Sequence, residues 1–149
     1  MNQALQNTLL LAGRILLSLV FILSGFDKIM HFEGTAAYMA GGGVPLVAVI
    51  LPLAIAFEFG GGLALALGWK ARWAALALIL FTIPATLIFH AFWAAPAAQA
   101  AMQQLQFMKN LAIIGGLLGF IVAGSGAWAL DRGASNLGIC GYPGATTPA

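Results

Sequence analysis

The sequence predicts an all-α integral membrane protein built as a four-helix bundle with short connections. Of its 149 residues, 62% are hydrophobic and only 7% are charged, whereas soluble domains carry about 25% charged residues. Four apolar stretches are each close to the roughly 20 residues that a helix needs to cross the hydrocarbon core. None alternates apolar and polar residues as a barrel strand would. The expected spans are residues 9–26, 46–67, 73–93 and 107–130.

The first expected span carries Arg14 near its middle, so its insertion needs checking. Residues 9–26 include twelve Leu, Ile, Val or Phe residues, together worth roughly −5 kcal/mol on an insertion scale. A central arginine costs about +3 kcal/mol on that scale. The segment is therefore still expected to span the membrane.

The connections between the spans differ in length. The connection at residues 31–45 could hold a short helix at the membrane surface, ended by Gly41-Gly42-Gly43 and Pro45. Residues 68–72 predict a tight hairpin between the second and third spans. A second interfacial helix is expected over residues 99–106. We expect one membrane domain, residues 1–132, and an irregular Gly- and Pro-rich tail, residues 133–149.

Basic residues near the helix ends favour a multi-pass topology with both termini in the cytoplasm. In that orientation Lys70, Arg72 and Arg132 lie inside, while Lys28 and Lys109 lie outside. The bilayer is the expected partner. A net charge of +2 is too small to indicate a nucleic-acid partner.

Two charges lie deep inside the expected spans and need partners there. Arg14 precedes Asp27 by thirteen residues, and Glu58 follows Pro45 by thirteen residues. At 1.5 Å per residue both would lie about 20 Å below the same membrane face. The sequence therefore predicts an Arg14–Glu58 ion pair, because either charge alone would be buried unpaired. Such a pair could serve only to fix helix registry, and that alternative stays open.

Further polar groups gather toward the outer face. We expect an outer-face cluster of Asp27, Lys28 and His31, for which a position among hydrated headgroups is the simpler interpretation. His90 and Asn110 lie inside their spans. The small-residue spacing from Lys109 to Ala123 predicts a packing face on the fourth helix that carries Lys109 into the bundle. The predicted intramembrane polar site comprises Arg14, Glu58, His90, Lys109 and Asn110.

An ordered set of short motifs resembles the DoxX family of small bacterial and archaeal membrane proteins. The set runs through Arg14, Phe21, Ser24-Gly25 and Lys28; Gly43-Val44-Pro45; Glu58, Gly61-Gly62 and Leu67-Gly68; His90-Ala-Phe-Trp93; Phe107-Met-Lys-Asn-Leu-Ala-Ile-Ile-Gly-Gly116; and Leu130-Asp131. One departure is Ala129, where the family often has Ser. The tail with Cys140 lies outside the resemblance.

The resemblance implies a location in the bacterial inner membrane and several roles. Some related proteins are subunits of a quinone-linked oxidoreductase, which makes quinone a candidate cofactor and a membrane or periplasmic redox protein a candidate partner. Others are maturation factors, so a non-catalytic scaffold or assembly factor is the alternative. In either case an accessory subunit is favoured over an enzyme acting alone. Fold kinship by itself does not transfer chemistry.

Other function classes have less support in the sequence. A small-solute transporter would need a homodimer to enclose a path. Haem is disfavoured, because His31 and His90 do not lie at facing mid-helix positions. The lone Cys140 excludes a Cys-based zinc site, and no other metal constellation is expected.

Overall fold

The computed structural model describes residues 2–131, and within them it shows helices and no strand. Four helical segments are long and apolar enough to cross a membrane, and they fit a multi-pass membrane protein. This confirms the predicted fold class. The segments are Gln3–Met30, Val47–Leu67, Ala71–Ala94 and Ala97–Ala123. The predicted domain boundary at residue 132 and the irregular tail lie outside the described residues.

The first helix, α1, is longer than its apolar stretch. It runs over Gln3–Met30, begins at Asn2, whose side chain accepts a hydrogen bond from the backbone N–H of Ala4, and ends at His31. Polar residues at both ends continue the helix because nothing in them breaks it. The following helix, α2 (Phe32–Gly41), is the short helix expected between the first two spans, and it ends at the glycines.

The second span is one continuous helical rod made of three parts. These are α3 (Val47–Ile55), a π-helical stretch η1 (Ala56–Gly60) and α4 (Gly61–Leu67). Pro52 lies inside α3 and lacks the N–H of a regular helical hydrogen bond. Such π-helical turns often mark functional positions in helices. Glu58 lies in this one.

The fourth span begins ten residues earlier than expected. After α5 (Ala71–Phe89) and the short 3-10 turn η2 (Phe92–Ala94), helix α6 runs over Ala97–Ala123. The prediction of a separate interfacial helix at 99–106 was wrong, and so was the prediction that the fourth span extends to residue 130. Pro96 precedes the first turn of α6, where its fixed φ suits a helix start, and no breaker separates that turn from the apolar stretch. Gly124, with φ of 76°, ends the helix.

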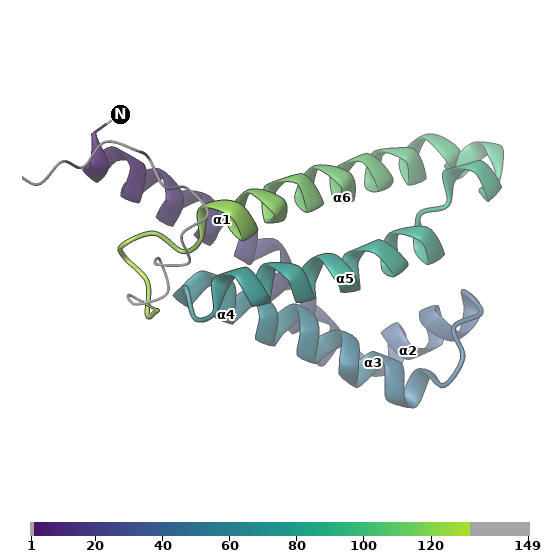
Figure 1. Ribbon diagram of the computed structural model, residues 1–149. Coiled ribbons are helices and arrows are strands. Elements are labelled where there is room, and N and C mark those ends of the chain that lie inside the picture. The colour runs from purple at the N-terminus through teal and green to yellow at the C-terminus, as the bar shows by residue number, and fades with distance from the viewer. Residues whose placement is uncertain (1, 132–149) are drawn as a thin grey trace, which may run out of the picture.

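The four spans pack as a bundle in which α5 has a central place. In Figure 1, α6 and the α3–α4 rod lie on either side of α5, and the N-terminal turns of α1 extend beyond the bundle. Helix α1 packs on η1 and α4 and touches α6. The buried apolar core comprises Phe21, Leu65, Ala71, Ala74, Ala75, Leu78, Ile79, Leu117 and Phe120.

Glycines let α1 approach the second span closely, as their small size predicts. A Cβ added at Gly25 would lie 2.8 Å from the backbone nitrogen of Phe59. A Cβ added at Gly62 would lie 2.9 Å from Ile22. The backbones of α1, η1 and α4 are therefore nearly in contact.

The predicted packing face of α6 was wrong for the single chain. Lys109, Gly119 and the other residues of that spacing are exposed, and a Cβ at Gly119 would meet nothing within 4 Å. Leu117 and Phe120 face the core instead. The larger side chains bury more apolar surface and make more dispersion contacts, so they decide which face of α6 points inward.

We predict that Gly25→Ala destabilises the bundle by about 1–3 kcal/mol, the typical cost of overpacking, because the new Cβ meets the backbone of η1. Gly119→Ala is the matched control and should cause no loss, since its Cβ enters open space. Unfolding in mixed detergent micelles measures both. Equal stability of the two variants would contradict the close approach of α1 and η1.

Candidate functional site

The structure places an ion pair between α1 and the π-helical stretch of the second span, with a buried carboxylate and a partly exposed ammonium. The inward stripe of α1 consists of Arg14, Ser18, Phe21 and Gly25, and Lys28 is the next residue at this 4-3-4-3 spacing. Its Nζ lies 2.8 Å from Oε2 of Glu58. The Nζ also donates a hydrogen bond of 2.7 Å to the hydroxyl of Ser24.

Glu58 is the less satisfied partner of this pair. Its residue is 7% exposed, and its Oε2 is fully buried. The Lys28 ammonium lies 2.8 Å from this oxygen, and no other donor within residues 2–131 bonds to it. A carboxylate out of water is costly unless it is both paired and hydrogen-bonded. Oε2 can therefore accept a hydrogen bond from a further donor.

The predicted Arg14–Glu58 ion pair was wrong. Arg14 is 1% exposed and donates its hydrogen bonds to backbone carbonyls. Its Nε reaches Ala66 O at 3.1 Å, its Nη1 reaches Ser125 O at 2.5 Å and its Nη2 reaches Trp128 O at 2.6 Å. The carbonyls of the last turn of a helix lack intrahelical partners, and a cation there is favoured by the helix dipole.

The depths of the two charges differ because the connections are not level. Helix α1 continues to Met30 and leads into α2, so its outer end does not match the start of α3. Arg14 lies level with Ala66, which is eight residues beyond Glu58. At 1.5 Å per residue that offset is about 12 Å, too far for a direct contact.

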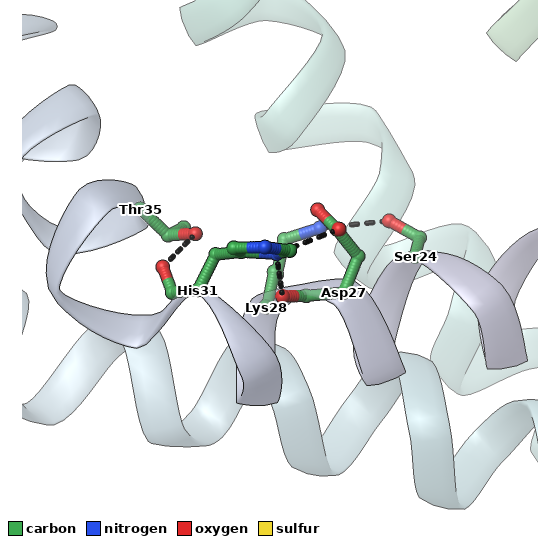
Figure 2. A network of polar contacts seen from close by, with 5 residues as sticks. All are labelled: Ser24, Asp27, Lys28, His31 and Thr35. Carbon is green, nitrogen blue, oxygen red and sulfur yellow. Dashed lines mark hydrogen bonds and ion pairs between the residues drawn. The ribbon is translucent and has the colours of Figure 1, made fainter.

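The outer-face cluster is divided by the structure. Figure 2 shows His31 bound to Asp27, Thr35 bound to the backbone of His31, and Lys28 bound to Ser24. The Asp27–His31 contact of 2.9 Å has side chains about 70% exposed (69% and 71%), so it contributes little to stability. Asp27 and His31 join α1 to α2 at the surface, whereas Lys28 belongs to the buried pair.

His90 and Asn110 form a separate polar seam between α5 and α6. Asn110 Nδ2 donates to the Thr86 hydroxyl at 2.9 Å, and His90 Nδ1 lies 2.9 Å from Oε1 of Gln103. Within residues 2–131, no hydrogen bond or ion pair joins Glu58 to this seam. The side chains of the seam are matched to each other.

Lys109 does not enter the bundle. It is exposed, and its Nζ donates to the side chain of Gln106 on the same helix. The five predicted site residues thus fall in four places: Arg14 at one end of the bundle, Glu58 in the middle, His90 and Asn110 at the α5–α6 seam, and Lys109 on the surface. Sequence reasoning assigned Lys28 to the headgroups, although its place on the α1 stripe was visible.

The comparison with known families decides the lineage. A sequence model of the DoxX family matches residues 9–91, more than half of the chain and the part that holds the Lys28–Glu58 pair. The chain belongs to the DoxX family. This confirms the resemblance that the sequence motifs carried.

Two relatives of this DoxX-family chain come from Escherichia coli strain K12. The inner membrane protein YqjF is 41% identical over 128 residues, which cover 86% of this chain and 93% of YqjF. The inner membrane protein YphA is 34% identical over 129 residues, covering 87% and 92%. No solved structure matches the chain.

We predict that Arg14→Met loosens residues 124–131, which Arg14 fastens to the end of α4. The free energy of unfolding should fall by about 2 kcal/mol, since three carbonyls lose a charged donor. The amides of Leu130 and Asp131, bonded to Leu67 O and Gly68 O, should exchange faster with deuterium. Arg72→Met is the control, because within residues 2–131 the one hydrogen bond of its side chain is a 3.4 Å contact to Val122 O. Equal exchange in both variants would contradict this role.

A double-mutant cycle tests the buried pair. Lys28→Met and Glu58→Gln should each cost about 3–5 kcal/mol, because each leaves an uncompensated charge or polar group, and the double variant should recover most of the loss. The cycle of Arg14→Met with Glu58→Gln should instead be additive. Unfolding in mixed micelles gives all the values. Coupling in the second cycle and additivity in the first would refute the assigned partners.

Proposed function

We propose that this chain is a small accessory subunit of a quinone-linked redox complex in the bacterial inner membrane, with the Lys28–Glu58 pair as the quinone headgroup site. The observation that carries the proposal is the buried Oε2 of Glu58, which within residues 2–131 has the Lys28 ammonium at 2.8 Å and no other donor. A carboxylate oxygen can accept more than one hydrogen bond, and a hydroxyl group of a bound quinol would supply a further donor.

The residues present fit such a headgroup. A quinone, when bound, supplies two-electron chemistry coupled to two protons. The ammonium of Lys28 can donate a hydrogen bond to a carbonyl oxygen, and it counters negative charge beside it. The carboxylate of Glu58 can accept a proton or a hydrogen bond. Ser24 holds the Lys28 ammonium in place through its 2.7 Å bond.

The depth of the pair suits a lipophilic ligand. Glu58 follows Val47 by eleven residues and precedes Leu67 by nine, so it lies about 16 Å and 14 Å from the two ends of the span. The side chain of Lys28 is 23% exposed, and that of Glu58 is 9% exposed. A headgroup arriving from the lipid would therefore reach Lys28 first and Glu58 behind it. Ionisable groups at such depths commonly mark ligand or proton sites.

A location in the inner membrane is supported by the names of both relatives and by the four apolar helices. The basic residues favour both termini in the cytoplasm. A redox partner protein supplies the electrons under this proposal. It can dock on the exposed α6 face of Lys109, Ala112, Gly116, Gly119 and Ala123, because small residues let a second helix approach.

That exposed face also favours an alternative, a non-catalytic scaffold or assembly factor. In this role the α6 face binds a transmembrane helix of a partner protein or of a second copy, and Lys28–Glu58 only fixes the registry of α1 against the second span. The two roles differ in whether the chain holds a quinone.

The test is extraction of quinone from protein purified out of native membranes in a mild detergent. We expect the wild type to retain quinone. Two variants test the site: Glu58→Gln, and Lys28→Met combined with Glu58→Gln. Each should retain at least about tenfold less quinone than the wild type, since a hydrogen bond to a charged group is worth about 1.5–3 kcal/mol. The double variant covers the case in which the single variant is too unstable.

His31→Ala is the matched control, because its side chain is exposed and bound only to Asp27 and its own helix. Its quinone content should equal that of the wild type. Absence of quinone from the wild type, or equal content in the Glu58 variants, rejects the proposal. If a partner protein then copurifies in fixed ratio and Gly119→Leu removes it, the scaffold role takes its place.

A further inference from the structure

A second feature is a groove on the exposed surface of the bundle, and Glu58 does not line it. This groove of about 370 Å³ runs between the second span and α5. Gly60, Gly61 and Ala64 form one wall and Ala74 and Ala77 the other, with Ala56 and Phe57 at one end. These small side chains leave a channel between two helices that larger residues would fill. Glu58 is not among the lining residues, so the groove is independent of the proposed quinone site.

The other end of the groove is aromatic and cationic. Trp69, Lys70 and Trp73 line it, and all three are exposed. The Nζ of Lys70 lies 5.7 Å from the centroid of the Trp69 ring, a distance at which a cation is attracted to the ring face. The turn at 68–70 joins two spans, and tryptophans at such positions mark the membrane–water interface.

An acidic residue, Asp131, also lies at this end of the groove. The carboxylate of Asp131 accepts a hydrogen bond from the backbone N–H of Lys70. The nearby Arg72 reaches toward the end of α6 at Val122. Among the residues that line the groove, Lys70 is the one that carries a positive charge.

We propose that this groove binds one anionic phospholipid, with an acyl chain against Gly60 and Gly61 and its phosphate beside Lys70. The walls are apolar and the mouth carries positive charge, which matches the two ends of such a lipid. The volume lies at the low end of small-ligand pockets, about 300–1,000 Å³. Contact with the walls and charge at the mouth supply the preference over bulk lipid.

Gly60 offers a substitution that fills the groove without a clash inside the chain. A Cβ added there meets nothing within 4 Å. The test places the protein in nanodiscs of equal phosphatidylglycerol and phosphatidylcholine, followed by native mass spectrometry. The wild type should carry one bound phosphatidylglycerol. Gly60→Leu should lower its occupancy about tenfold, because the leucine takes the space of the acyl chain. Gly119→Leu, also in open space on α6, should leave occupancy unchanged.

Lys70→Gln separates the headgroup from the chain. The variant should lose about fivefold in preference for phosphatidylglycerol over phosphatidylcholine, the effect of one lysine near a membrane surface. Lys109→Gln, an exposed lysine elsewhere, should keep the preference. If Gly60→Leu does not fold, Lys70→Gln decides, since its side chain is exposed.

Several outcomes would overturn the proposal. Equal binding of the two lipids by the wild type removes the role of Lys70. Undiminished phosphatidylglycerol on folded Gly60→Leu removes the groove. A dimer that Gly60→Leu dissociates would assign the groove to a second copy of the chain.

Discussion

The absence of water from the membrane interior is the constraint on which this bundle depends. Each polar group within the hydrocarbon must find its partner inside the chain. At one end of the bundle, Arg14 donates hydrogen bonds to three backbone carbonyls. These carbonyls belong to the end of α4 and to the segment after α6. These hydrogen bonds offset the desolvation cost of the guanidinium. They also hold together two segments that are far apart in the sequence. The five donors of an arginine, in a fixed fork, suit this task better than a lysine would.

The number and type of the spans could be predicted from the sequence, because lipid imposes length and composition on a spanning helix. The helix ends could not be. The polar ends of α1 and the glutamines of α6 continue their helices. Hydropathy detects apolar residues only, so it does not show that a helix continues through polar ones. The error at Arg14 has the same origin. The predicted depths depend on the expected helix ends. In the structure, the end of α4 near Leu67 lies level with Arg14, and Glu58 does not.

The candidate site was half predictable. Glu58 stood out as a buried charge, but its partner was sought by depth alone. The spacing of Arg14, Ser18, Phe21 and Gly25 already placed Lys28 on the inward stripe of α1. Long basic side chains near span ends usually reach toward the headgroups, and this general rule conflicts with the spacing. The rule fails here because an unpaired carboxylate deeper in the bundle attracts the ammonium more strongly than water at the surface does.

The two charged centres differ in a way that packing alone does not require. Arg14 has an acceptor for each of its nitrogen atoms, whereas the buried Oε2 of Glu58 has the Lys28 ammonium beside it and no other donor within residues 2–131. Uncharged residues at both position 28 and position 58 would avoid the cost of burying these charges. The carboxylate also sits in a π-helical stretch, where α1 approaches so closely that Gly25 can carry no side chain. A costly charge held at an irregular helical position by a close backbone contact favours a group that acts on a ligand over one that only sets registry.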